Sequence, residues 1–127
     1  MGLKGHGAAV YALSWSRDGS KLASASGDKA VKIWNVLTGA LIMTLVGHTD
    51  GVHSVAWSPD GTKVASASAD RTVKVWNTVT RELVLTLEGH SNWVLSVVWN
   101  PEGSKLASAS YDDTAVVWDS ISGEQIA

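Results

Sequence analysis

Short runs of β-branched, aromatic and other apolar residues alternate with turn residues along the whole chain. The run from Val10 to Ser16 ends in the turn signal Arg17-Asp18-Gly19, and Gly27-Asp28-Lys29 marks a second tight turn. Short apolar runs bounded by Gly, Asp and Pro predict β-strands. Four such strands joined by short turns predict an antiparallel meander. The expected strands of this first unit cover residues 10–16, 22–26, 31–35 and 40–45.

The meander pattern recurs twice at an interval of 42 residues, because the Gly-His pair at 5–6 returns at 47–48 and at 89–90. Each unit also has one Trp at the end of its first strand and another in its third strand. A period of about 40–45 residues with an early Gly-His and a late Trp is typical of a β-propeller blade. The pattern therefore predicts an all-β chain of three units, which are residues 5–46, 47–88 and 89–127.

The late Trp of each unit is followed by Asn or Asp, as Trp34-Asn35, Trp76-Asn77 and Trp118-Asp119. Together with the Gly-His pairs in the same register, these motifs make the units resemble the WD-repeat (WD40) family over essentially the whole chain. The resemblance implies a WD40 β-propeller with three four-stranded antiparallel blades per chain. It also implies a protein-interaction scaffold. Asn in place of Asp in the first two units is a mild departure from the family motif.

The resemblance further implies a hydrogen-bond network of Asp, His, Ser and Trp in each blade. In such a network Asp fixes one imidazole nitrogen, and the other nitrogen meets the Ser hydroxyl, which also accepts from the indole N–H. Polar side chains inside a sheet need partners of this kind. The matching positions are His6, Ser24, Asp28 and Trp34 in the first unit, His48, Ser66, Asp70 and Trp76 in the second, and His90, Ser108, Asp112 and Trp118 in the third.

Ser, His and Asp are also the residues of hydrolase triads. Repetition argues against catalysis, because a catalytic constellation is needed once and this trio recurs in every unit at one spacing. The Gly-x-Ser-x-Gly motif of a nucleophile elbow is absent from the sequence. We therefore predict that the trio is structural and that the chain is not an enzyme.

Composition narrows the function classes further. The 127 residues include no Cys, and the net charge is −2 with Lys and Arg scattered, so no nucleic-acid footprint is expected. No apolar run approaches the roughly 18 residues of a membrane span, and no signal core is present, which predicts a cytoplasmic location. His53 lies outside the predicted networks and has no Cys or carboxylate at ligand spacing, so no metal or cofactor is expected.

Three blades do not close a ring, because propellers typically have roughly four to eight blades. Alternation along the first strand predicts one small and one large face, and a large face packs on the small face of its neighbour. One face of each kind then stays bare at the two ends, which predicts a ring closed by homo-oligomerisation. The faces expected in the first unit are Val10, Ala12 and Ser14 against Tyr11, Leu13 and Trp15.

A homodimer gives six blades and a homotrimer gives nine. The smaller ring costs less association entropy, but a wider ring relieves crowding of the inner strands, and the Val and Leu residues on those strands slightly favour the trimer. Residues 1–4 have the register of 43–46, so we expect them to complete the fourth strand of the last blade in a neighbouring chain. The near-identical repeats also fit an engineered chain or a fragment of a longer repeat array.

The resemblance implies ligand contacts on one rim, beside the first Val of each unit and before the turn Asp. At these positions the third unit has Trp93 and Tyr111, where the first two units have only Gly or Ala. Trp and Tyr are enriched at binding hot spots, although both residues also suit simple packing. The candidate partner-binding rim is Tyr11, His53, Trp93, Leu95 and Tyr111.

Two functions follow from this reading. The first is a self-assembling protein-interaction scaffold that binds peptides or proteins on its rim. The second is a purely structural or engineered self-assembling module with no ligand of its own. A ligand site should break the symmetry of the repeat, and Trp93 and Tyr111 do so, which favours the first function.

Overall fold

The structure is a computed structural model that describes residues 2–127 and arranges them in three antiparallel sheets. Two of the sheets have four strands, in the order β1-β2-β3-β4 and β5-β6-β7-β8. We call these sheets blade 1 and blade 2. Their strands are β1 Val10–Trp15, β2 Lys21–Ser26, β3 Ala30–Asn35, β4 Leu41–Val46, β5 Val52–Trp57, β6 Lys63–Ser68, β7 Thr72–Asn77 and β8 Leu83–Glu88.

The third sheet, blade 3, has three strands in the order β11-β10-β9: β9 Val94–Trp99, β10 Lys105–Ser110 and β11 Ala115–Asp119. The position of a fourth strand is partly filled by residues 124–127. Gln125 forms an isolated bridge with Trp118, and Val117 bonds to Ile126 and Ala127 through backbone hydrogen bonds of 2.7 Å each. The prediction of four strands therefore holds for the first two blades, and the fourth strand of blade 3 is incomplete.

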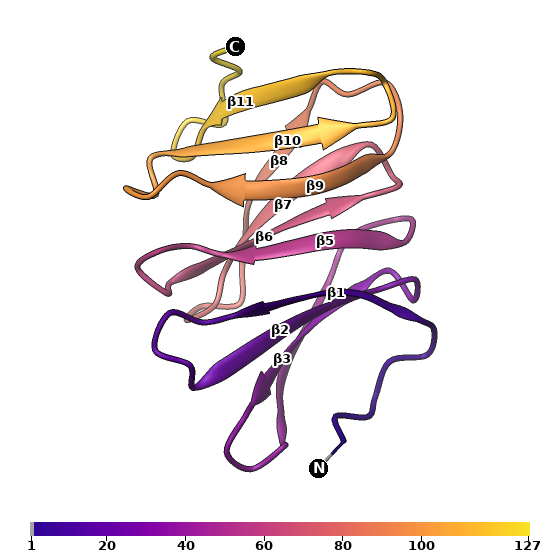
Figure 1. Cartoon of the computed structure of the whole chain (residues 1–127), viewed down its shortest axis with the longest axis vertical. Helices are drawn as coiled ribbons and strands as arrows, with labels where there is room; N and C mark the ends of the chain where they lie inside the picture. The colour runs from indigo at the N-terminus through magenta and orange to yellow at the C-terminus, as the bar shows by residue number, and fades with distance from the viewer. Residues whose placement is uncertain (1) are drawn as a thin grey trace.

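The three blades lie side by side in chain order, from indigo at one end of the molecule to yellow at the other (Figure 1). β1, β5 and β9 each form one edge of their sheet, and β1 contacts β5 and β5 contacts β9 across the two blade junctions. The N-terminal and C-terminal segments lie at opposite ends of this row (Figure 1). None of the described residues forms a helix of the length and hydrophobicity that a membrane crossing requires.

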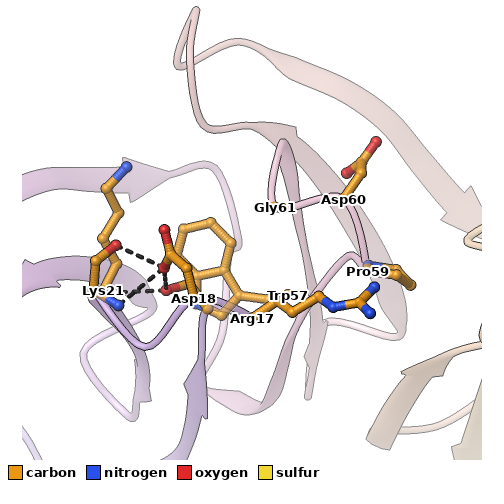
Figure 2. A pocket seen from close by; sticks show the side chains of 9 residues that line it. Arg17, Asp18, Lys21, Trp57, Pro59, Asp60 and Gly61 are labelled. Atoms are coloured by element: carbon orange, nitrogen blue, oxygen red, sulfur yellow. Dashed lines mark hydrogen bonds between the residues drawn. The ribbon is translucent and has the colours of Figure 1, made fainter.

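The turn between the first two strands of blade 1 is closed by Asp18. One carboxylate oxygen of Asp18 accepts from the hydroxyls of Ser16 and Ser20 and from the backbone N–H of Ser20. The Ser20 backbone bond, followed by the two hydroxyl bonds, lowers the pKa of Asp18 to about 2. A hollow of about 430 Å³ lies between this turn and the equivalent turn of blade 2, with Arg17 and Lys21 beside it (Figure 2).

The first strand of every blade contains a β-bulge that the alternating pattern did not predict. In blade 2, Val52 pairs with Ser68 but Ser54 already pairs with Ala67, so His53 is the extra residue. A bulge reverses the alternation of faces beyond it. Val52 therefore shares a face with Val55, and the predicted face of Val10, Ala12 and Ser14 is wrong at its first position. The same shift occurs at Tyr11 and at Leu95.

Each blade junction packs a face rich in Ala against a face of larger side chains. Between blades 1 and 2, Ala23 and Ala25 of one sheet meet Val52, Val55 and Trp57 of the next in a single core cluster. The junction of blades 2 and 3 repeats this arrangement with equivalent residues, which are Ala65, Ala67, Val94, Val97 and Trp99. The predicted packing of a large face on a small face is therefore present. The Val that precedes the bulge, such as Val52, belongs to the large face.

The two outer faces of the row are uncovered within this chain. Val10 is 49% exposed and Trp15 is 59% exposed, whereas the equivalent Val52 and Trp57 inside the row are 0% and 8% exposed. On the opposite end, Ala109 of blade 3 is exposed although the equivalent Ala67 of blade 2 is fully buried. The same residue types are thus buried at the internal junctions and bare at the ends.

Candidate functional site

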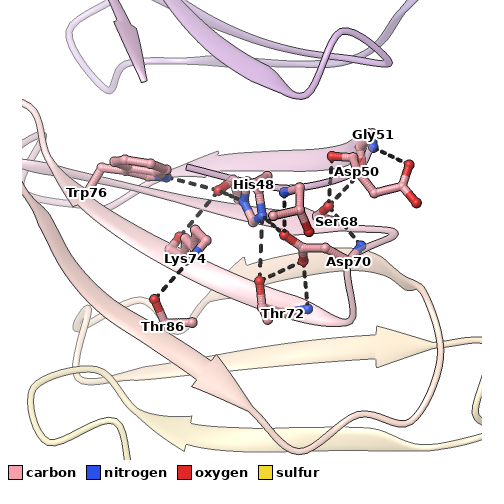
Figure 3. Close-up of polar contacts among 11 residues, drawn as sticks. His48, Asp50, Gly51, Ser68, Asp70, Thr72, Lys74, Trp76 and Thr86 are labelled. Atoms are coloured by element: carbon pink, nitrogen blue, oxygen red, sulfur yellow. Dashed lines mark hydrogen bonds and ion pairs between the residues drawn. The ribbon is translucent and has the colours of Figure 1, made fainter. Parts of the chain in front are cut away.

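The polar network of blade 2 links the strands β6 and β7 to the loop before β5. Nδ1 of His48 donates to a carboxylate oxygen of Asp70 at 2.8 Å, as Figure 3 shows. The hydroxyl of Ser66 lies 2.6 Å from Nε2 of His48, and the indole N–H of Trp76 donates to that hydroxyl oxygen at 3.0 Å. Asp70 also accepts from the backbone N–H groups of residues 49 and 72, so one carboxylate fixes both the loop and the turn.

The other two blades have the same network with nearly the same distances. The His–Asp distance is 2.8 Å in both, the His–Ser distances are 2.6 and 2.7 Å, and both Trp–Ser distances are 2.8 Å. All twelve residues implied by the family resemblance are therefore brought together, four to a blade. The residues are His6, Ser24, Asp28, Trp34, His48, Ser66, Asp70, Trp76, His90, Ser108, Asp112 and Trp118.

The three network carboxylates are held in the ionised form. Burial of Asp70 opposes ionisation, but hydrogen bonds from His48 and Thr72 outweigh it and lower the pKa of Asp70. The pKa of Asp28 is lowered in the same way against its burial, chiefly by the backbone N–H of Gly7 and by His6. At Asp112 the hydroxyl of Thr114 is the main cause of the lowered pKa. An ionised carboxylate accepts from Nδ1–H of its His, which leaves Nε2 as the acceptor for the Ser hydroxyl.

The Ser-His-Asp geometry of each network is that of a hydrolase triad, but its surroundings differ. The whole of Ser66 is buried at 0% exposure, and its oxygen already accepts the indole N–H of Trp76. A nucleophile must reach the substrate carbonyl and have an oxyanion hole beside it. A buried hydroxyl beneath a Trp ring lacks that access. The network therefore ties strands together, which is the role implied by the family resemblance.

Four ring side chains form a continuous row along one rim, which we call the aromatic row: Tyr11, His53, Trp93 and Tyr111. Tyr11 and His53 lie 5.3 Å apart between ring centroids, and His53 stacks on Trp93 at 5.3 Å with an interplanar angle of 26°. Trp93 meets Tyr111 at 5.7 Å and 57°. Tyr11, Trp93 and Tyr111 are exposed, so a surface of π-systems crosses all three blades.

The backbone places these rings on the rim. Tyr11 and His53 are the extra residues of the bulges in β1 and β5, so their side chains leave the regular alternation. Trp93 precedes β9, and its carbonyl oxygen accepts the N–H of Tyr111 at 3.0 Å. The Tyr11 ring lies over Gly27, where an added Cβ would come within 3.2 Å of the phenol oxygen. Glycine at position 27 thus makes room for the row.

The sequence analysis predicts all four residues of the aromatic row as rim residues, but it does not predict that their rings contact one another. Tyr11 and His53 are 42 residues apart and so occupy equivalent positions in their units. Trp93 occupies a different position, two residues before the equivalent Leu95, and the repeat alone therefore does not predict its contact with His53. Leu95, the fifth predicted rim residue, is the partly buried extra residue of the β9 bulge and takes no part in the ring contacts. Nε2 of His53 is buried without a hydrogen-bond partner among the described residues.

No group of three or more His, Asp or Glu side chains within residues 2–127 has the geometry to hold a metal ion. The hollow beside Arg17 does contain two carboxylates, but Asp18 and Asp60 are both used to close turns. The aromatic row is therefore the candidate functional site that the described residues favour.

Three meander sheets in a row, each with the same internal network, define a β-propeller repeat protein. The chain belongs to the WD40 family, because the family model described as WD domain, G-beta repeat matches residues 1–35, 39–77 and 81–119. These segments cover most of the chain. The second and third segments each begin with the last strand of the preceding blade, β4 or β8, and continue through the first three strands of the next blade. Members of this family generally act as protein-interaction scaffolds without catalytic activity.

Curated relatives match the chain over about one repeat. WD repeat-containing protein 1 of Gallus gallus is 51% identical over 43 residues, which are 34% of this chain and 7% of that protein. Protein Mut11 of Chlamydomonas reinhardtii is 50% identical over 42 residues, or 33% of this chain and 11% of that protein. Vegetative incompatibility protein HET-E-1 of Podospora anserina is 50% identical over 37 residues, or 29% and 3%. The aligned segments thus span only a small part of these relatives.

Proposed function

We propose that this chain is a non-catalytic scaffold that binds a peptide or protein partner on the rim carrying the aromatic row. The observation that carries the proposal is the row itself, in which four rings from three blades contact one another and three stay exposed. Aromatic side chains supply large contact areas at low entropic cost, and Trp and Tyr dominate binding hot spots. A row that crosses two blade junctions suits an extended partner segment.

A displayed peptide library selected against the protein tests the rim. Two variants remove rings by giving blade 3 the residues of blade 2: Trp93→Gly copies Gly51, and Tyr111→Ala copies Ala69. Both should fold, because blade 2 has those residues at the same backbone positions. We expect selected peptides to bind the native protein and to lose at least about tenfold in affinity to either variant. Peptides that bind both variants unchanged would place the binding surface elsewhere.

We further propose that copies of the chain assemble head to tail, so that the large face of blade 1 packs on the Ala face of blade 3 in a neighbouring copy. The internal junctions supply the template, because the bare Val10, Leu13 and Trp15 match residues that are covered in blades 2 and 3. A contact between two different faces of identical chains makes a ring when the rotation closes. The ring then has six blades as a homodimer or nine as a homotrimer.

The edge of β11 supports the same assembly. In blade 2 the neighbouring strands pair Val73 with Leu87 and Thr72 with Glu88. The equivalent positions are Ala115 in β11 and Thr114 just before it. Residues 124–127 pair with residues 117–119 and not with these two positions. By the repeat, Leu3 and Lys4 of a second copy correspond to Leu87 and Glu88. Met1, the first residue of the predicted pairing segment, lies outside the described residues.

Light scattering coupled to size-exclusion chromatography tests the assembly. One chain has a mass of 13.4 kDa, so a dimer or trimer gives a discrete particle of two or three times that mass. A stable monomer would contradict closure by other copies. A broad distribution that shifts with concentration would indicate open filaments instead of rings. A discrete ring that binds no library peptide would favour the alternative of a purely structural or engineered module. A cytoplasmic location stays a prediction from the sequence.

A further inference from the structure

The charge on the rim changes from blade to blade beside the aromatic row. The tip of the turn between the second and third strands is Lys29 in blade 1, Arg71 in blade 2 and Asp113 in blade 3. All three tips have positive φ angles, of 76°, 76° and 69°, so they occupy the same backbone conformation. The turn of blade 3 therefore has two adjacent carboxylates, Asp112 and Asp113, whereas in each of the other two turns the Asp is followed by a cationic residue.

The two carboxylates of that turn have different uses. Asp112 is engaged by His90 and by the hydroxyl of Thr114 in the internal network. Asp113 is exposed and makes no hydrogen bond or ion pair within the part of the chain that the structure describes. The cationic side chain that Lys29 or Arg71 supplies at this place in the other blades is absent from this turn. Asp113 thus provides an exposed carboxylate two positions along the chain from the exposed Tyr111.

The two rings of the aromatic row that belong to blade 3 are Trp93 and Tyr111, which contact each other. Tyr111 is separated from Asp113 by one residue, and its backbone N–H is bonded to the carbonyl of Trp93. Both rings are exposed, and no cationic side chain of the described residues lies over them. An aromatic face attracts a cation, most strongly when the ring is Trp, and a planar guanidinium also stacks on it.

We propose that the blade 3 end of the aromatic row binds an arginine side chain of the partner segment, with the guanidinium on Trp93 and Tyr111 and Asp113 as its counter-ion. This inference rests on the proposed rim function and adds the chemistry of the partner. Asp113 favours a cationic residue of the partner at blade 3. Lys29 and Arg71 favour acidic or neutral residues of the partner at blades 1 and 2. The partner segment is therefore expected to bind in one orientation, with its arginine at the blade 3 end of the aromatic row.

Nuclear magnetic resonance titration with the tripeptide acetyl-Ala-Arg-Ala-amide tests the proposal. The matched probe replaces Arg with citrulline, which keeps the shape and removes the charge. We expect the Arg probe to shift the indole N–H signal of Trp93 and to bind about fivefold more tightly than the citrulline probe. The difference should shrink in 0.5 M salt, about where a Debye length falls to a few ångströms.

Asp113→Arg is the matched variant, because Arg71 has the same place and the same backbone conformation in blade 2. It should keep the native spectrum elsewhere and abolish the preference for Arg over citrulline. Equal binding of the two probes, or an unchanged preference in Asp113→Arg, would overturn the inference. If neutral library peptides still bind in a Trp93-dependent way, the rim function stands and only the arginine preference fails. If no peptide binds the rim, both fail.

Discussion

The indole N–H of Trp99 donates a hydrogen bond of 2.9 Å to the carbonyl oxygen of Ala56 across the junction of blades 2 and 3. At the junction of blades 1 and 2 the equivalent Trp57 is packed in the core, and its indole nitrogen has no partner among the described residues. Trp57 is thus buried without that hydrogen bond, whereas Trp99 is partly buried and makes it. At the open end of blade 1, Trp15 is exposed, and its indole N–H has no partner among the described residues.

Trp15 and Trp57 should therefore respond differently to truncation. In a head-to-tail ring, Trp15 packs on the blade 3 face that includes Val98, which is the repeat equivalent of Ala56. We expect Trp15→Ala to lower the assembled mass with little effect on the unfolding of one chain. We expect Trp57→Ala to cost about 3–5 kcal/mol of unfolding free energy, because it empties an internal junction. Light scattering and urea unfolding separate the two effects, and an unchanged particle mass in Trp15→Ala would argue against the ring.

Leu3 is the second residue whose role depends on assembly. The repeat equates it with Leu45 and Leu87, which are buried in the junction cores, although Leu3 itself is only half-buried here. We expect Leu3→Ser to raise the dissociation constant of the assembly by at least about tenfold, since a buried Leu contributes roughly 2 kcal/mol or more. Lys4→Ser is the control, because the Lys4 side chain is exposed. Analytical ultracentrifugation over a dilution series gives the dissociation constants of the two variants. Equal dissociation constants would exclude a contact of Leu3 in the assembly.

Ser66 should be the most sensitive hydroxyl of blade 2. Removing it leaves Nε2 of His48 and the indole N–H of Trp76 without their partner in a buried site. Each unsatisfied buried group costs about 1–3 kcal/mol, so we expect Ser66→Ala to lose roughly 2–4 kcal/mol of unfolding free energy. Thr49→Ala changes an exposed side chain of the same blade and should stay within about 0.5 kcal/mol of the native protein. Similar urea midpoints for the two variants would show that the network contributes little.

The repeat made most of this fold predictable from the sequence, because every signal appears three times in one register. The strand positions and the family resemblance follow from Gly-His, the late Trp and the turn signals, and the resemblance in turn implies the members of the network. The bulges were missed because a bulge changes the pairing of one residue and leaves no mark in an alternating apolar run. For that reason the predicted face of Val10 is wrong. The same residue type recurs at Val52 and Val94, so the repeat gives no sign of the bulge either.

The aromatic row shows the other limit of sequence reasoning. Tyr11, His53, Trp93 and Tyr111 were each recognised as rim positions, but contacts between different positions of adjacent units depend on the angle between blades. The sequence does not encode that angle in any local pattern. The need for a glycine at position 27 likewise becomes clear only from the structure, in which the Tyr11 ring lies over Gly27.

The ionised network carboxylates make stability depend on pH in a direction that can be tested. The ordinary pKa of an Asp carboxyl is 3.8, and the folded protein lowers the pKa of Asp70 below it. A group with a lowered pKa in the folded state binds fewer protons there than in the unfolded chain, so unfolding free energy falls as the solution is made more acidic. The contribution of Asp70 is therefore fully present above about pH 4 to 5 and is lost progressively as the pH falls below 3.8 toward the pKa of the folded state.

Asp70→Asn should flatten that acid dependence as well as lower the stability at neutral pH. The measurement is urea unfolding at a series of pH values from 2 to 7, at one protein concentration so that assembly does not confound the comparison. Asp113→Asn is the matched control, because Asp113 is an exposed carboxylate one blade away that makes no hydrogen bond within the described residues. We expect the control to keep the native slope below pH 4. If Asp70→Asn retains that slope too, the acid sensitivity arises outside this network, and the hydrogen bonds from His48 and Thr72 do not outweigh the burial of the carboxylate.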